Sequence, residues 1–196
     1  MIPRSAQIAI ALMLAGVLGA GVFMLQLKQR EVAALQAGAD SRPLSAPLSG
    51  PQQTVKLAIA YDDDRGLRRE ERTAALPQEP GDRAREILRL LLAVYLKKPS
   101  VHPLADGSDV KDVFLLKDGL CVVDLNSAFA EGHRSGIMVE ELTVASIIET
   151  LTMNQPSIRQ VKFLVEGRDR ETLAGHADLR LTYDVPAVHE LVAEIE

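Results

Sequence analysis

Aromatic residues are scarce in this chain of 196 residues, which contains no tryptophan, three tyrosines and four phenylalanines. A core with so few rings must consist mainly of Leu, Val, Ile and Ala side chains. The hydrophobic fraction of 47% still provides enough apolar surface for packing, which excludes wholesale disorder. The length accommodates one domain of ordinary size together with appended segments.

Cysteine is almost absent. The single cysteine, Cys121, excludes an internal disulfide. A nucleophilic cysteine requires a neighbouring base and an accessible thiolate, whereas Cys121 lies in the apolar sequence LCVVDL. We therefore predict a buried and inert thiol.

The sequence also lacks the residue patterns of common active sites and metal sites. The acidic run at 62–64 is no EF-hand, because Leu67 and Thr73 occupy the positions of the turn glycine and the bidentate glutamate. The segment GHRSG at 132–136 is one residue out of register for a nucleophile elbow. The four histidines are dispersed without zinc-ligand spacing: His102, His133, His176 and His189. We therefore predict no catalytic residue, no metal and no cofactor.

An excess of basic residues is missing as well, since the net charge is −5. The charged residues around the first apolar run are Arg4, Lys28, Arg30 and Glu31, and their charges sum to +2. Residues 32–196 therefore carry a net charge of −7. A nucleic-acid-binding domain carries a basic surface, and an anionic membrane surface attracts Lys and Arg. The composition therefore excludes nucleic acid as a partner and disfavours peripheral binding to anionic lipid.

The N-terminus contains a long hydrophobic run, residues 8–25, without any charged or polar side chain. A helix of this length rises about 27 Å, close to the bilayer core of about 30 Å. A signal peptide cleaved after Ala20 is the alternative, but Leu18 is large for such a site and the run continues to Leu25. Val17 occupies the position of an acylated cysteine, which excludes a lipoprotein signal. We predict an uncleaved membrane anchor.

The orientation of this anchor is not fixed by charge, because Arg4 precedes the run while Lys28 and Arg30 follow it. A short N-terminal tail before a single span usually leaves the C-terminal domain outside the cytoplasm. We therefore expect a single-pass cell-membrane protein whose domain is extracytoplasmic, either periplasmic or at the cell surface.

Composition divides the chain into four segments. Residues 1–30 form the anchor, and residues 31–53 form a flexible linker rich in Pro, Ser and Ala. The folded domain occupies residues 54–184, and residues 185–196 form a short amphipathic tail.

The folded domain alternates strands and helices. Helices are predicted from Asp82 to Tyr95 and from Ser135 to the break at Pro156. Residues 67–76 are expected to be irregular or a short strand. The arginines of the first helix are expected on its solvated face (Arg83, Arg85 and Arg89). Strands are predicted at 55–61, 111–116, 120–125, 161–165 and 179–183. We therefore predict an α+β fold, a small mixed sheet with two helices packed on one face, preceded by one N-terminal transmembrane helix.

The second predicted helix is apolar on more than one side. Besides the main apolar stripe of this helix, Leu142 and Met153 lie on its far side. Burial between the sheet and a neighbouring loop explains this pattern, and so does a surface that faces a partner. Leu142 and Met153 are therefore the candidate interaction residues.

The folded domain resembles the GerMN domain family, which is named from proteins of bacterial sporulation and spore germination. The resemblance covers most of residues 55–184. It includes VKLAIAY at 55–61, LRREER with Arg72, Pro103 and Gly107 before the middle hairpin, LCVVDLNSAF around Asp124, and SIIETLTMNQPSIRQVKFLVEG followed by LAGH, with Gly167, Gly175 and His176. The last motif is the most specific.

The resemblance implies a ring-building-motif-like, non-catalytic domain outside the cytoplasm. Some relatives resemble ring-building modules of envelope-spanning complexes. The implied partners are an envelope protein or a second copy of the chain, with peptidoglycan as a further partner. The motif residues are then structural.

Two alternatives remain open. The domain would act as an envelope sensor if it bound a peptidoglycan fragment or a germinant, because both functions require only a surface. A peptidoglycan hydrolase is less favoured: Asp124 and His176 would serve as orienter and base, but the sequence brings no nucleophile to them.

Overall fold

The computed structural model describes residues 44–195, with side chains up to Ala193. The membrane anchor predicted at 8–25 and the linker up to residue 43 lie outside this range. Between residues 44 and 195, no helix has the length and apolar character needed to cross a membrane.

The described part begins with a long hairpin. Strands β1 (Gln52–Tyr61) and β2 (Gly66–Ala75) pair antiparallel along their whole length. The apolar residues of β1 are buried, whereas β2 buries Leu67 and exposes most of its charged side chains. The segment expected to be irregular or a short strand is therefore the ten-residue strand β2, Gly66–Ala75. The backbone of β1 supplies the hydrogen bonds, so this strand forms without an apolar alternation of its own.

The second sheet has four strands in the order β3-β4-β5-β6. Strands β4 and β5 are parallel, and the other two pairs are antiparallel. The predicted α+β class with a mixed sheet is thus confirmed, but the opening strand was wrongly placed in that sheet. The bounds are Val110–Leu115 for β3, Leu120–Leu125 for β4, Gln160–Val165 for β5 and Thr182–Asp184 for β6.

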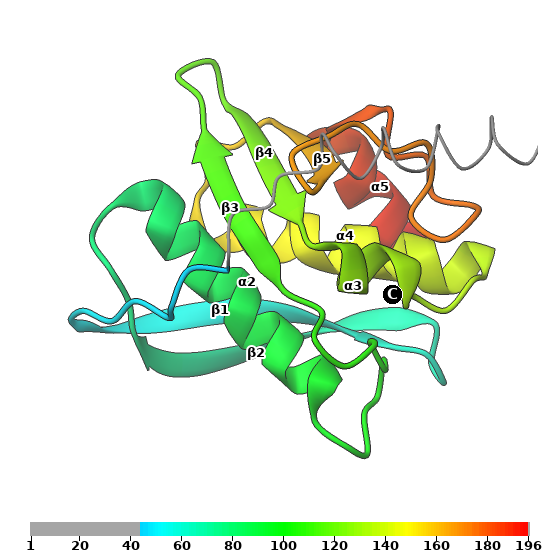
Figure 1. Ribbon diagram of the computed structural model, residues 1–196, viewed down its shortest axis with the longest axis horizontal. Coiled ribbons are helices and arrows are strands. Elements are labelled where there is room, and N and C mark those ends of the chain that lie inside the picture. Colours follow the sequence, from blue (N-terminus) through cyan, green and yellow to red (C-terminus); the bar gives the residue numbers. More distant parts are fainter. Residues whose placement is uncertain (1–43, 196) are drawn as a thin grey trace, which may run out of the picture. The chain divides into compact units, whose positions relative to one another are not determined.

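Two long helices, α2 (Pro80–Leu96) and α4 (Ile137–Asn154), pack beside each other. Helix α2 also packs on β3, and α4 runs along β1. Figure 1 shows the hairpin at the bottom of the view and the strands β3 to β5 above it, with α4 between them. The short helix α3 (Ser127–Glu131) precedes α4, and the chain's last described element is α5 (Val185–Ile195).

A row of polar side chains on α4 explains why β1 stays out of the larger sheet. Ser146, Thr150 and Asn154 are spaced by four residues and therefore lie on one helix face. Thr150 Oγ1 accepts a hydrogen bond from the Ala58 amide at 3.0 Å, and Ser146 Oγ donates to the Ala58 carbonyl at 2.7 Å. Asn154 bonds both the amide and the carbonyl of Lys56. These side chains satisfy the strand edge that a third strand would otherwise occupy.

The arginines of α2 are not all solvated. Arg85 is 4% exposed, and its guanidinium contacts the carboxylates of Asp82, Glu86 and Asp112 at 3.0 to 3.4 Å. Arg89 bonds Asp109 Oδ1 through Nε at 2.9 Å and also reaches Glu86. A buried guanidinium requires such carboxylate partners. The prediction of a solvated face was wrong for Arg85 and for Arg89, whose side chain is 11% exposed. The acidic residues around β3 come close to them only in the folded chain.

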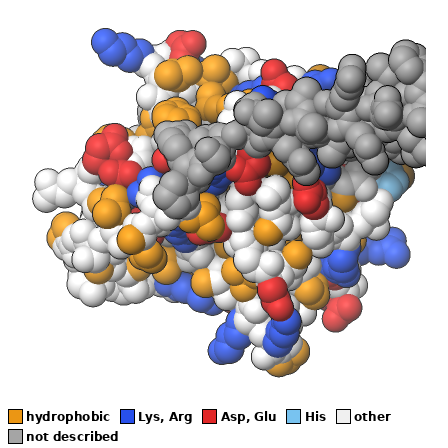
Figure 2. Space-filling model, in the orientation of Figure 1, with side chains coloured by type: hydrophobic (Ala, Val, Ile, Leu, Met, Phe, Trp, Pro, Cys, Tyr) orange, Lys and Arg blue, Asp and Glu red, His pale blue; other side chains and the backbone are white. Residues whose placement is uncertain are grey.

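One continuous core joins the two sheets and the helices. Cys121 is fully buried in it, and burial raises the pKa of its thiol to about 12. The predicted burial of this thiol is thereby confirmed. On the opposite face of the four-stranded sheet, Phe114 and Leu116 are about half exposed. Figure 2 shows hydrophobic side chains gathered near the outer end of the β3–β4 hairpin, next to charged ones.

Candidate functional site

The structure separates the two candidate interaction residues of α4. Leu142 is 1% exposed and belongs to the core, so it does not contribute to the surface of this chain. Met153 is half-buried at the C-terminal end of the helix, where it borders two clefts. Of the two candidate residues, only Met153 brings an apolar side chain to a cleft, and Leu142 is part of the core.

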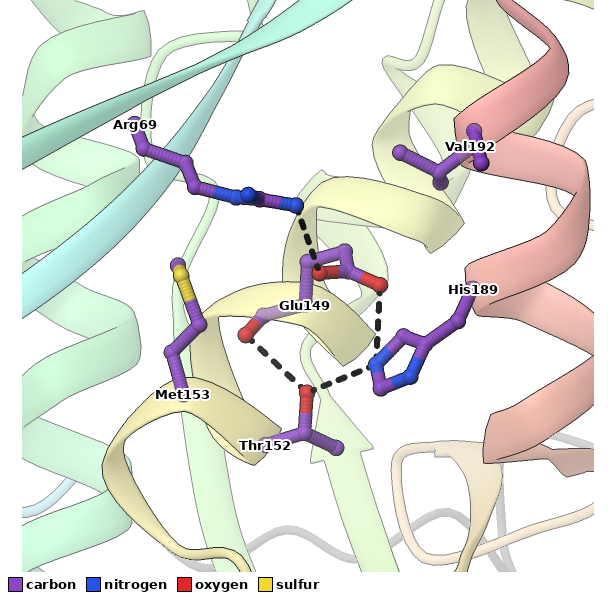
Figure 3. A pocket seen from close by; sticks show the side chains of 7 residues that line it. Arg69, Glu149, Thr152, Met153, His189 and Val192 are labelled. Atoms are coloured by element: carbon purple, nitrogen blue, oxygen red, sulfur yellow. Dashed lines mark hydrogen bonds and ion pairs between the residues drawn. The ribbon is translucent and has the colours of Figure 1, made fainter.

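The first cleft, here named the Met153 cleft, lies between β2, α4 and α5 and has a volume of about 370 Å³. Helix α5 forms one wall because Val188 and Val192 are buried. Figure 3 shows Arg69 reaching in from β2 and His189 from α5, with Met153 and Thr152 on α4 below them. The lining residues are Arg69, Glu149, Thr152, Met153, His189, Val192 and Ala193.

A buried carboxylate lies at the centre of the Met153 cleft. The Glu149 side chain is 5% exposed, and its Oε1 lies 3.0 Å from His189 Nε2. Its Oε2 lies 4.0 Å from Arg69 Nη2. Thr152 Oγ1 is 3.4 Å from the same histidine nitrogen. Because the side chains of Arg69 and His189 are themselves about half exposed, the carboxylate is covered by groups that an incoming partner can contact.

An adjoining cleft of about 450 Å³ continues from Met153 over the face of β2. Its other lining residues are charged, with both signs represented: Lys56, Arg69, Glu70 and Glu71. Together the two clefts form an apolar centre at Met153 with a rim of mixed charge. An apolar centre with a charged rim suits binding. Thr152 Oγ1 donates to the Ile148 and Glu149 carbonyls of its own helix, and it also lies 3.4 Å from His189 Nε2.

The family-motif residues lie elsewhere and contact backbone. Asp124 is 1% exposed at the end of β4, and its Oδ1 accepts a hydrogen bond from the Gly167 amide at 2.8 Å. Gly167 has φ +71°, a conformation that favours glycine. Gly107 also has a positive φ, and its carbonyl accepts a hydrogen bond from Asn126 Nδ2. These residues hold the turns around β4 and β5.

The remaining motif residues occupy three different surroundings. Arg72 lies on β2 and pairs with Glu70 at 3.0 Å. Pro103 is exposed between two buried residues of the loop that follows α2. Gly175, with φ +125°, is part of the turn that carries His176. None of these residues lines the Met153 cleft.

His176 belongs to a cluster around Glu140, a fully buried carboxylate of α4. Glu140 Oε2 accepts hydrogen bonds from the amides of Ala174, His176 and Ala177 at 2.9 to 3.0 Å. Its Oε1 lies 2.9 Å from His176 Nδ1 and accepts the Gly136 amide at 3.1 Å. Burial alone would raise the pKa of Glu140, but the bonds from the His176 side chain and the amides lower it to about 2. Glu140 therefore fixes the loop before β6 to α4.

This geometry bears on the hydrolase alternative. Asp124 and His176 have different partners, Gly167 and Glu140, so the two are not joined as orienter and base. Ser135 Oγ lies 3.4 Å from His176, but it approaches the same nitrogen, Nδ1, as the Glu140 carboxylate. A Ser-His-acid relay needs the hydroxyl and the carboxylate on opposite ring nitrogens. These three residues therefore do not form such a relay.

A second buried polar cluster was not predicted from the sequence. His102 Nδ1 lies 2.6 Å from Asp62 Oδ1, and His102 Nε2 lies 2.6 Å from Thr143 Oγ1. The same Thr143 oxygen lies 2.8 Å from His133 Nε2, and Arg134 pairs with Asp62. Burial lowers the pKa of His102 and of His133.

This second cluster has the order of an acid-histidine-hydroxyl relay, but its hydroxyl is inaccessible. Thr143 is 1% exposed and His102 is fully buried, so no substrate reaches the hydroxyl. The cluster instead connects the end of β1 and two loops to α4. No spacing signal marks it, because His102 and His133 are 31 positions apart in the chain and come together only in the folded protein, where both contact Thr143.

Comparison with known proteins places the domain in a family. No curated protein matches the chain. Among solved structures, the tandem GerMN domains of the sporulation protein GerM from Bacillus subtilis are 18% identical, with a TM-score of 0.51 over 68% of this chain and 46% of that one. The chain thus spans about half of that tandem structure.

Two further structures give lower structural scores. The first GerMN domain of the same protein is 19% identical, with a TM-score of 0.48 over 67% of this chain and 96% of that one. A candidate lipoprotein from Clostridium perfringens is 17% identical, with a TM-score of 0.47 over 72% of this chain and 93% of that one. The model of the family called Germane, described as sporulation and spore germination, matches residues 58–171. The match covers more than half of the chain, which therefore belongs to the Germane family and carries a domain of the GerMN type.

Proposed function

We propose that this chain is a non-catalytic binding and assembly domain of the bacterial cell envelope, held at the membrane by its apolar N-terminal segment with the domain outside the cytoplasm. Membership in a family described by sporulation and spore germination supports a role in one of these processes. The hydrophobic run at 8–25 supports the membrane attachment.

The observation that carries the binding proposal is the arrangement around Met153. An apolar, flexible thioether lies at the centre, and charged side chains of both signs surround it. Protein interfaces commonly have an apolar centre with a polar rim, and methionine adapts its shape to different partners. The Glu149 carboxylate adds a buried charge that the half-exposed Arg69 and His189 cover. The occupant is a segment of an envelope protein that brings its own apolar side chain to Met153.

Site-specific photo-crosslinking tests this proposal in the full-length chain. A photoreactive amino acid replaces Met153 in cells that produce the protein, and a matched variant carries it at Lys117, which is exposed at the tip of the β3–β4 hairpin. The proposal predicts a crosslinked protein partner at position 153 and none at 117. An absence of crosslinked protein at position 153, or equal yields at both positions, contradicts it. Mass spectrometry of the product separates a different envelope protein from a second copy of the chain.

The predicted orientation has its own test. A reporter enzyme that is active only outside the cytoplasm is fused to the C-terminus of the full chain. Activity supports an extracytoplasmic domain, and a stably produced but inactive fusion overturns that placement.

A further inference from the structure

A second groove lies on the other side of α5, separate from the Met153 cleft. It has a volume of about 430 Å³ and is bounded by α4, the turn before β6, β6 itself and α5. Ala187 and Leu191 of α5 line this groove, whereas His189 and Ala193 line the Met153 cleft. Positions separated in this way lie on opposite sides of a helix. We name it the α5 groove.

The α5 groove is apolar in its floor and in part of its rim. Its floor includes Val144, Ala145 and Val188, all below 8% exposure. Its rim includes Leu181 and Leu191, which are 55% and 48% exposed. Two large apolar side chains that remain in water beside an apolar floor are typical of an interaction site.

The charged residues of the groove share one sign. Glu141, Asp178 and Asp184 line it, and no Lys or Arg is among its lining residues. Tyr183 lies beside these carboxylates, and its hydroxyl donates a hydrogen bond to the backbone carbonyl of Asp178 at 3.0 Å. Burial and then the charges of Asp178, Glu141 and Glu140 raise the pKa of Tyr183 to about 12. The Asp178 carboxylate is itself paired with Arg180, at 2.8 Å from Nη2. The negative charge that faces the apolar floor therefore comes from Glu141 and Asp184.

We infer that the α5 groove docks a segment of a partner protein that presents leucine-type side chains with Lys or Arg one helical turn away. The apolar side chains fill the space between Leu181 and Leu191, and the basic group meets Glu141 and Asp184. An amphipathic helix places its anchors in this spacing. This docking does not depend on the Met153 cleft.

Charge also argues against a second copy as the occupant. Residues 32–196 carry a net charge of −7, so two copies of the domain repel each other at long range. Like charges across an interface weaken association and reject wrong partners. A basic segment instead gains attraction that decreases with salt.

The test uses the full chain in detergent and fluorescent synthetic peptides. One peptide has leucines at i, i+3, i+4 and i+7 flanked by lysines, and its matched control has glutamates in place of the lysines. Fluorescence anisotropy should show binding of the lysine peptide and at least roughly tenfold weaker binding of the glutamate peptide. Equal binding of the two peptides, or no binding of the lysine peptide, overturns the inference.

Variants of the protein locate the binding. Leu181→Ser with Leu191→Ser, and separately Glu141→Lys, should each lower the affinity for the lysine peptide by roughly tenfold. Asp63→Lys, in the exposed turn between β1 and β2 and outside the three clefts described above, is the matched charge control and should change the affinity little. These side chains are largely on the surface, and circular dichroism checks that folding is retained. The inference is overturned if the leucine variant binds the lysine peptide with unchanged affinity. It is also overturned if the parent chain self-associates and the leucine variant does not.

Discussion

Glu140 and Glu149 are two buried carboxylates on the same helix, and their surroundings differ. Glu140 is fully buried and is bonded by four backbone amides and the His176 ring. Glu149 is also buried, but it contacts Arg69 and His189, whose side chains are about half exposed. Backbone donors move only when the loop moves, whereas exposed side chains can rotate away. The first carboxylate therefore maintains the fold, and the second can exchange its partners when another molecule binds.

Among the changes predicted here, replacing Glu140 should have the largest effect on the stability of the fold. Glu140→Gln should lower the free energy of unfolding by about 3 kcal/mol, since the pKa of Glu140 falls from 4.5 to about 2 on folding. The new amide group would also face N–H donors. Glu149→Gln should cost only about 1 kcal/mol, because exposed partners contribute little.

Urea unfolding of the full chain, followed by circular dichroism, measures both changes. Glu141→Gln, at the adjacent and partly exposed position, is the control and should stay within about 0.5 kcal/mol of the parent chain. The contrast between the two carboxylates is wrong if Glu149→Gln proves as destabilising as Glu140→Gln.

The pH dependence of stability should show two windows. Burial lowers the pKa of His102 and His133 below 6.5, so the unfolded chain binds these protons more readily, and their contribution is lost as the pH falls below 6.5. The contribution of Glu140 is present above pH 4.5 and is lost as the pH falls toward about 2. The free energy of unfolding, measured across this pH range, should therefore depend less on pH below 4.5 in Glu140→Gln than in the parent chain. Its pH dependence just below 6.5 should be unchanged. An unchanged lower window would contradict the assignment.

A smaller effect should distinguish the two polar faces of α4. Thr150→Val leaves the buried Ala58 amide without its acceptor, which should cost about 2 kcal/mol. Thr152→Val removes a hydroxyl that donates to carbonyls of its own helix and has only a long contact of 3.4 Å with His189, so it should cost less than about 1 kcal/mol. Thermal unfolding of the two variants measures the difference. Equal losses would show that the α4 side chains bonded to the β1 backbone are not what holds this strand edge.

Local signals predicted much of the fold. The Asp118-Gly119 turn joins β3 and β4 as expected, and the strand at 161–165 and both long helices form where periodicity placed them. The charged strand β2 was predicted only as one of two alternatives, because its pairing depends on β1 and not on its own pattern. Arg85 was placed in solvent, because its partner Asp112 is 27 residues away.

The candidate site was predicted only in part. Helical periodicity singled out Met153 and Leu142 together, but only packing could decide that Met153 borders two clefts and Leu142 is core. The other residues that line the Met153 cleft come partly from β2 and α5, which lie at opposite ends of the domain sequence. The family motif was recognisable from its residues, and the match over residues 58–171 confirms it.

The sequence by itself determined the family, the α+β class and most element positions, because these depend on short-range patterns of side chains and turns. Tertiary structure decided the environment of each polar residue. Glu140, Thr143, Ser146, Glu149 and Thr150 follow one another on α4 with no local feature that separates them. Their roles differ because loops, β1 and α5 bring different donors to each one, and such contacts between distant segments leave no periodic trace in the chain.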